Sequence, residues 1–470
     1  MKRSCFIILF MTIFPFFTYS HQLEIFNFNS YSHKHEKNRG NTVAELVRQS
    51  LRFSIESRTE LQNLYQARAA IRVSMGQILP QLDPSSAIAA GMDLSASIDT
   101  FLPLVGSIFP NRWYTFKASY ILRKAEKFVA QSVLADRAKI IQDIYYNIQT
   151  QIWSIRVLEF YENQIGELIH YLSTTRKYKN LKRDLALLEN LKARISYDRA
   201  FIDSLSASLP QLATEVGLNP SVDWAHLTLE KCDIASLKKE ILGKYYDYWP
   251  QALERSPEVK YAFQLIRAAR ASKFATYFDI FDIANGSTIN FGTFSLYKSE
   301  RSNVQVCEIG LKQAKMQLSN NIQNALNNYN DAIEAIPPME DAVAKLEDIR
   351  RAVSRNINNK SSKIDINNIL WYFTYAEGQA LRLVTGYFSF KIAQADLNRY
   401  TWNGPIYNIV QDYIDLELPQ RLIEIRRTNS IPFHITQRLR IDKYFYKNYT
   451  PPPQEPHHDN FSMNDSSEEE

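Results

Sequence analysis

The sequence predicts a mainly α-helical protein with a small β part, built from a module of long helices that occurs twice. Only 13 of the 470 residues are glycine, about 3% where an average chain has about 7%, which leaves little material for tight turns. From Ile121 to Gly166 the chain runs for more than 40 residues without proline or an internal glycine. A helix of that length measures roughly 65 Å, which few globular domains need.

The N-terminus has the pattern of a secretory signal peptide. Lys2 and Arg3 precede an apolar run from Cys5 to Phe17, and we expect cleavage after Ser20. The alternative is a membrane anchor, but about 13 apolar residues fall short of the roughly 20 that span a bilayer. The sequence therefore predicts an exported protein.

The rest of the chain divides into two similar repeats. The expected organisation is a signal peptide at 1–20, a polar leader at 21–41, a first repeat at 42–217, a linker or equatorial segment at 218–250, a second repeat at 251–405, a C-terminal extension at 406–449 and a disordered tail at 450–470. Each repeat is expected to contain a helix, two strands, a very long helix and a coiled-coil helix. Such a unit is too long for a solenoid repeat and indicates a duplication.

Local signals place the elements within each repeat. Thr42 followed by Glu45 predicts a capping box at the first helix. Residues 113–120 alternate with a period of two, which predicts a strand, and residues 276–298 read as two strands around an Asn-Gly hairpin signal. The long helix that starts near Asn303 in the second repeat is expected to break at the two prolines 337–338, with a local kink as the alternative.

The segment that begins at Lys363 carries two interleaved apolar series, each with a period of seven residues. Such series form the a and d positions of a coiled coil, although an amphipathic helix of an ordinary bundle is the alternative. The predicted seam residues are Ile366, Ile369, Phe373, Ala376, Leu383 and Phe390. The same alternation of three- and four-residue spacings occurs in the first repeat after Leu188.

This ordered set resembles the TolC-like outer-membrane efflux proteins. The likeness lies in "VAELVRQSLRFSIESRTELQNLYQARAAIRVSMGQILPQL", "ALERSPEVKYAFQLIRAARAS" and "KIDINNILWYFTYAEGQALRLVTGYFSFKIAQADLNRYTW". It implies a homotrimer in which each chain gives four strands to one shared twelve-stranded β-barrel in outer-membrane lipid. The helices would form a hollow periplasmic tunnel that docks a periplasmic adaptor and an inner-membrane RND or ABC pump. The tunnel would be a passive conduit for efflux or type I secretion.

The resemblance also implies roles for particular residues. Asp365 and Asn368 match two acidic positions that constrict the periplasmic entrance of the tunnel, and Asp184 matches the corresponding place in the first repeat. An aspartate near a helix start is equally well explained as a helix cap. Candidate barrel aromatics are Tyr114, Phe116, Tyr120 and Phe291, although aromatic residues on strands can also fill a soluble core.

Other functional classes lack support in the sequence. The chain contains no phosphate-binding glycine loop, no Gly-x-Ser-x-Gly elbow and no His-Glu-x-x-His motif, so we expect neither an enzyme nor a cofactor or metal site. The formal charge of +5 falls to +3 without Lys2 and Arg3, and no nucleic-acid partner is indicated. The remaining alternative is a periplasmic coiled-coil scaffold without a working pore.

Overall fold

The computed structural model describes residues 23–24, 41–78, 110–175, 180–204, 208–218, 229, 243–279, 291–358 and 365–429. The predicted signal peptide, most of the polar leader and the predicted disordered tail lie outside these residues. The chain divides into two compact units, residues 1–419 and 420–470. The first unit contains almost all of the described helices.

The described residues are nearly all helical, as the sequence predicts. The helices of the first unit are α2 (Val43–Phe53), α3 (Ile55–Ile78), α6 (Pro110–Thr175), α7 (Leu181–Ser204), α8 (Ser208–Val216), α9 (Tyr245–Arg255), α10 (Pro257–Asp279), α11 (Phe291–Asn358), α12 (Ile366–Thr401), α13 (Pro405–Asp412) and the π-helical turn η4 (Tyr413–Glu417). Helix α14 (Leu418–Asn429) begins in the first unit and continues into the second.

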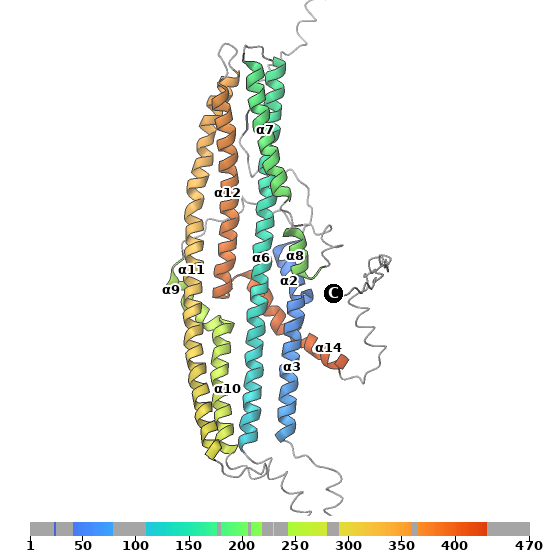
Figure 1. The fold of residues 1–470 in the computed structure, drawn as a ribbon, viewed down its shortest axis with the longest axis vertical. Helices are drawn as coiled ribbons and strands as arrows, with labels where there is room; N and C mark the ends of the chain where they lie inside the picture. The colour runs from blue at the N-terminus through green and yellow to red at the C-terminus, as the bar shows by residue number, and fades with distance from the viewer. Residues whose placement is uncertain are drawn as a thin grey trace, which may run out of the picture. The chain divides into compact units, whose positions relative to one another are not determined.

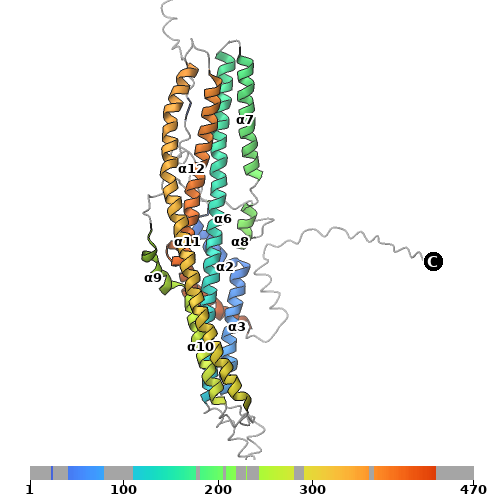
Figure 2. The same cartoon turned by 60° about the vertical axis from the view of Figure 1, so that its left-hand side comes forward.

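Two continuous helices organise the first unit. Helix α6 has 66 residues and α11 has 68, so each is about 100 Å long at 1.5 Å per residue. Helices α3 and α7 pack along α6, one after the other, and α10 and α12 pack in the same order along α11 (Figure 1). Helices α10 and α12 also contact α6, and Figure 2 shows the same arrangement from a second direction. The predicted duplicated long-helix architecture is confirmed.

The main core lies where α6, α7, α11 and α12 run together. Large side chains fill it, among them Trp153 and Tyr161 of α6 and Phe373 of α12. The six predicted seam residues are all buried, with exposed fractions of 8% or less. Helix α2 begins as expected, because the Glu45 N–H donates to Thr42 Oγ1 (3.1 Å) and the Thr42 N–H donates to the Glu45 carboxylate (2.9 Å).

The strand predicted at residues 113–120 is wrong, because these residues lie in α6. The same stretch also carries a helical spacing, since Tyr114, Ala118 and Ile121 recur four and three residues apart. These residues pack against α10, where the Tyr114 ring lies 5.4 Å from Phe274 and 5.6 Å from Phe278, measured between ring centroids. Packing at the helical period therefore overrides the short two-residue alternation. Phe116 and Tyr120 lie in the same helix.

The second predicted strand pair differs in the same way. Residues 276–279 belong to α10, and α11 already begins at Phe291. Phe291 is therefore a helical residue rather than part of a strand. Residues 280–290, with the Asn-Gly signal, lie outside the described residues. Helix α10 thus ends later, and α11 begins earlier, than the sequence pattern predicts.

The predicted break at Pro337 and Pro338 is also wrong, because both prolines lie inside α11. Helix α11 packs against α12 on both sides of the two prolines. The Tyr387 hydroxyl donates to the Glu340 carboxylate (2.5 Å), and Ile336 packs in the cluster that α12 contributes to. A proline inside a helix costs about 3 kcal/mol, and these contacts stabilise the helix on both sides of the two prolines.

The predicted C-terminal extension begins as part of the bundle. Tyr407 and Val410 of α13 and Tyr413 and Ile414 of η4 are buried. Helix α13 packs against α6 and α2. The chain after residue 405 therefore closes one side of the first unit before it reaches residues 430–470, which lie outside the described part.

Candidate functional site

The three candidate gate residues lie at one end of the bundle, where α7 and α12 begin (Figure 1). Asp365 is the N-cap residue of α12, and Asn368 lies one turn into that helix. Asp184 lies in the first turn of α7. The structure therefore places both aspartates near the starts of corresponding helices, Asp365 at the N-cap of α12 and Asp184 three residues after the first residue of α7.

Asp365 combines a structural role with an exposed charge. Its Oδ1 accepts hydrogen bonds from the backbone N–H groups of Asn367 (3.2 Å) and Asn368 (3.5 Å). Its Oδ2 accepts a further bond from the Asn368 side-chain amide (2.7 Å). These are the bonds of an N-cap, worth about 1 kcal/mol. Because Asp365 is exposed, its negative charge also faces solvent.

Asp184 is in a different environment. Its residue is 5% exposed, and its backbone N–H donates to the Asn180 carbonyl (3.1 Å). A carboxylate in the first turn complements the helix macrodipole. Of the two aspartates, Asp365 is therefore the one whose charge is exposed at this end of a single chain.

A stacked aromatic pair follows Asn368 on the same side of α12. The Trp371 and Tyr375 rings are 5.1 Å apart and almost parallel, at 7°. Trp371 is 53% exposed and Tyr375 is 36% exposed. Their positions three and seven residues after Asn368 are visible in the sequence, but neither residue belongs to the apolar seam, and sequence reasoning missed both. The start of α12 thus presents one stripe of acidic, amide and aromatic side chains.

A buried cation joins three helices further along the bundle. Arg399 of α12 is 3% exposed, and it donates from Nε to Asp136 of α6 (2.6 Å) and from Nη2 to Glu258 of α10 (2.6 Å). Nη2 also donates to the Ser132 hydroxyl (3.0 Å). Burial alone would lower the pKa of Arg399, but the charges of Glu258 and Asp136 and their hydrogen bonds raise it.

The partner carboxylate shows the matching effect. Burial alone would raise the pKa of Glu258, but the Arg399 charge and hydrogen bonds from Ser132, Ser256 and Arg399 hold it below its usual value of 4.5. Ser256 separates α9 from α10, and its hydroxyl also accepts from the Val259 N–H (3.3 Å). The cluster therefore fixes the point where one short helix follows the other.

The first repeat has a comparable cluster. Ser54 separates α2 from α3, and Glu56 in the first turn of α3 pairs with Arg137 of α6 (2.5 Å). Arg137 also pairs with Glu215 of α8. Ser54 and Ser256 occupy the same place in the two repeats, between two consecutive helices, and they are 202 residues apart (256 − 54 = 202). Sequence reasoning missed both arginines, because their partners lie far away in the chain.

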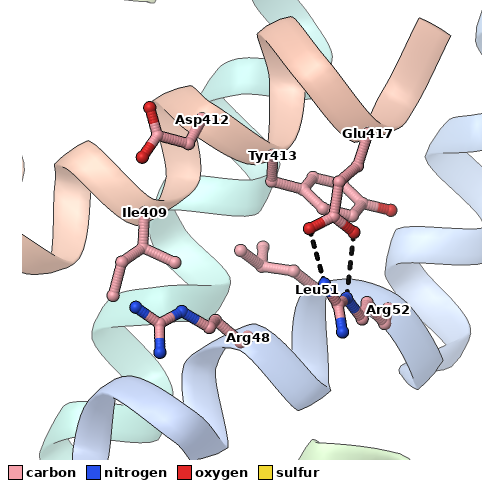
Figure 3. A pocket seen from close by; sticks show the side chains of 7 residues that line it. All are labelled: Arg48, Leu51, Arg52, Ile409, Asp412, Tyr413 and Glu417. Atoms are coloured by element: carbon pink, nitrogen blue, oxygen red, sulfur yellow. Dashed lines mark hydrogen bonds and ion pairs between the residues drawn. The ribbon is translucent and has the colours of Figure 1, made fainter. Parts of the chain in front are cut away.

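A small pocket lies between α2, α13 and η4 (Figure 3). It has a volume of about 200 Å³ and is lined by Arg48, Leu51, Arg52, Ile409, Asp412, Tyr413 and Glu417. Arg52 and Glu417 form a two-pronged ion pair across it, with nitrogen-to-oxygen distances of 2.9 and 2.7 Å. The volume is below that of a typical ligand site. We interpret the pocket as a gap beside the ion pair that fastens η4 to α2.

Two general features of the described residues bear on function. No three histidine, cysteine, aspartate or glutamate side chains gather among them in a way that could hold a metal ion. None of the described helices is both long and apolar enough to cross a membrane.

Of the comparisons with known proteins, the one with solved structures identifies the fold. No family model matches the chain, and no curated protein matches it. Among solved structures, the Campylobacter jejuni outer-membrane channel CmeC is similar with a TM-score of 0.61 and 10% identity, over 84% of this chain and 93% of that one. The outer-membrane channel OprN has a TM-score of 0.60 and 12% identity, over 77% and 90%.

A third neighbour is the open state of the Neisseria gonorrhoeae MtrE outer-membrane channel. Its TM-score is 0.59 and its identity 12%, over 77% of this chain and 89% of that one. The chain has the TolC-like fold of these channels. The resemblance read from the sequence is therefore confirmed for the fold.

Proposed function

We propose that the protein is the outer-membrane channel-tunnel of a tripartite efflux or type I secretion system. The observation that carries this proposal is the pair of continuous helices of 66 and 68 residues, flanked by coiled-coil arms, in a TolC-like fold. Helices of about 100 Å are suited to bridging a wide aqueous compartment. A homotrimer would enclose a passive conduit, with a periplasmic adaptor and an inner-membrane RND or ABC pump as partners.

In this proposal the protein is not an enzyme and needs no cofactor. The pump would select the cargo and supply the energy, and the tunnel would provide a continuous path. The solved neighbours are themselves described as outer-membrane channels. We infer the same location for this chain, with the helical part in the periplasm.

The membrane-embedded part would come from the end of the bundle opposite Asp365. Residues 79–109 and 280–290 connect helices there and lie outside the described residues.

The periplasmic entrance would be controlled at Asp365. In a trimer, three Asp365 carboxylates and three Asn368 amides would face the threefold axis, giving three charges instead of the six of an all-acidic pair of rings. Fewer charges at a constriction weaken cation binding there. The neighbour MtrE was observed in an open state, which is consistent with an entrance that has more than one conformation.

The gate hypothesis is tested by separating the charge of Asp365 from its capping bonds. Asp365→Ser keeps an N-cap oxygen and removes the charge, whereas Asp365→Ala removes both. Single-channel conductance in planar bilayers should change to the same extent in both variants, and only Asp365→Ala should also lower stability, by about 1 kcal/mol. Conductance that changes only with Asp365→Ala would mean that the residue is a cap and not a gate.

A second variant tests the proposed effect of the missing charge. The Asn368 side-chain amide now donates to the Asp365 carboxylate (2.7 Å). Asn368→Asp would put a second carboxylate beside Asp365 and give six charges per trimer. We expect stronger block by divalent cations than in the unmodified channel. Unchanged block would argue against Asn368 facing the conduction path.

The second candidate function is a periplasmic scaffold without a pore. The observation in its favour is that residues 113–120 and 291–298, expected in strands, are helical. A scaffold should remain helical and soluble in the periplasm. A channel should gain β structure when it is extracted from the outer membrane in detergent, and circular dichroism of both fractions distinguishes the two.

A further inference from the structure

A short stretch of the N-terminal leader lies inside the helical bundle. Leu23 is fully buried and belongs to the main core, with residues of α6, α7, α11 and α12. The side chain of Glu24 is not part of that core, and its residue is exposed. The leader was expected to be a polar segment ahead of the first repeat, and the structure instead places its single leucine among the core residues of both repeats.

The backbone of this stretch is held by side chains from three different helices. Arg350 of α11 donates from Nη1 to the Leu23 carbonyl. Gln164 of α6 donates to the Glu24 carbonyl (2.8 Å), and the Tyr372 hydroxyl of α12 donates to the same oxygen (3.4 Å). Two consecutive carbonyl groups are therefore satisfied by side chains rather than by a helix or sheet.

Two of the three donors are buried. Gln164 is 7% exposed and Tyr372 is fully buried. A buried donor that loses its partner costs about 1–3 kcal/mol, so an empty site would leave the Gln164 amide and the Tyr372 hydroxyl without these bonds. Three donors that bind backbone carbonyl groups and an apolar space that holds one leucine side chain are the features expected of a site that binds extended polypeptide.

We propose that the site between α6, α11 and α12 binds an extended peptide through one leucine side chain and two consecutive backbone carbonyl groups, and that Leu23 and Glu24 of this chain are its resident ligand. The site joins α6 to α11 and α12, and so it connects the helices of the two repeats. Any movement that separates α6 from α11 and α12 must break the three hydrogen bonds and expose Leu23. The segment therefore acts as a latch, and this role does not depend on whether the protein forms a pore.

The length of the tether supports intramolecular binding. Residues 25–41 join the site to the N-cap of α2, and about 17 residues can span at most about 60 Å. Because the segment is covalently joined to the site, its binding is intramolecular, and its effective concentration there exceeds that of a free peptide at ordinary concentrations. The chain's own segment should therefore keep the site occupied even if a free peptide binds weakly.

The first experiment measures hydrogen exchange by mass spectrometry in the full-length chain. Leu23→Asp should undock the segment, because it places a charge in an apolar space, and exchange should become at least tenfold faster near Gln164, Arg350 and Tyr372. The matched control is Glu24→Ala, which keeps the backbone carbonyl and should leave exchange unchanged. Equal exchange in both variants would overturn the proposal.

The second measurement separates a binding site from a merely structural contact. A synthetic peptide of residues 21–27, HQLEIFN, is added to the Leu23→Asp chain, and exchange near Gln164 should slow again. A fluorescent form should bind this variant at least tenfold more tightly than the unmodified chain, whose site is filled. The same peptide with aspartate in place of leucine should not bind.

Failure of the peptide to bind, or equal binding to both chains, would overturn the proposal. If Leu23→Asp does not fold, Leu23→Ala is used in the same two measurements, because it removes the leucine contacts without adding a charge. These outcomes concern the site alone, since conductance and assembly are measured separately.

Discussion

Replacing Arg399 with methionine should cause a large loss of stability. Methionine fills similar volume but removes one buried cation, its two ion pairs of 2.6 Å and its bond to the Ser132 hydroxyl. Breaking a fully buried ion pair costs about 3–5 kcal/mol because a buried charge is left behind. Here the partner side chains are 57% exposed at Asp136 and 39% exposed at Glu258. Water can hydrate the remaining carboxylates, so we expect about 2–3 kcal/mol.

The assay is the urea midpoint of the full chain, followed by circular dichroism. The matched control is Arg270→Met, which breaks an exposed pair with Glu308 at 2.9 Å, where the side chains are 58% and 45% exposed. Exposed pairs contribute about 0–1 kcal/mol. Equal shifts for Arg399→Met and Arg270→Met would refute the reasoning that burial makes the Arg399 cluster strong.

The same substitution should change the response to acid. Because the folded-state pKa of Glu258 is lowered, its contribution is fully present above its unfolded pKa of about 4.5 and is lost as the pH falls through the lower folded value. Without Arg399 that pKa should rise toward or above its usual value. The stability of Arg399→Met should therefore fall less than that of the unmodified chain when the pH is lowered from about 5 to about 3, a range that includes the usual glutamate pKa.

Two further predictions concern the buried carboxyl group of Glu377 and the backbone of Gly217, which follows the end of α8. Burial raises the pKa of Glu377, although the nearby Arg194 acts in the opposite direction. The stability that the protonated carboxyl group contributes is therefore lost as the pH rises through its unfolded and folded pKa values. Glu377→Gln should remove that loss and leave the urea midpoint at pH 7 unchanged or higher, and a clear fall of the midpoint would contradict this reasoning. Gly217 has φ +86°, and a Cβ there would lie 2.6 Å from the Phe53 carbonyl, so Gly217→Ala should destabilise by about 1–3 kcal/mol. Its control, Gly378→Ala, meets no atom within 4 Å and should stabilise by up to about 1 kcal/mol.

The sequence was most informative where one period extends over many residues. The seven-residue series from Ile366 marked side chains that are buried in α12, and the long stretch after Ile121 marked most of α6. Such patterns average over several turns, so one misleading residue has little weight. The capping box at Thr42 and Glu45 was equally clear, because both partners lie within one turn.

Short patterns were less reliable. Eight alternating residues at 113–120 fitted a strand, but the contact of Tyr114 with α10 requires the helical period. The two prolines in α11 carried a local cost, and packing against α12 stabilises the helix on both sides of them. In both cases a contact distant in sequence decided the structure, and a single sequence does not contain that information.

The candidate site was predicted in part. Asp365 and Asn368 lie together at the start of α12, and Asp184 lies at the equivalent start of α7, but the sequence could not show that Asp184 is covered while Asp365 is exposed. The Arg399 cluster joins residues up to 267 positions apart. Docking of Leu23 depends on three helices at once. Such arrangements follow from the fold rather than from any local motif.

The most direct test of the channel proposal is the native mass of the protein, extracted in detergent from outer membranes that have been separated by density. The account predicts a homotrimer in the outer-membrane fraction, released only by detergent, because single chains could not close a pore. A monomer or dimer in the soluble periplasmic fraction would contradict the channel proposal and favour the scaffold.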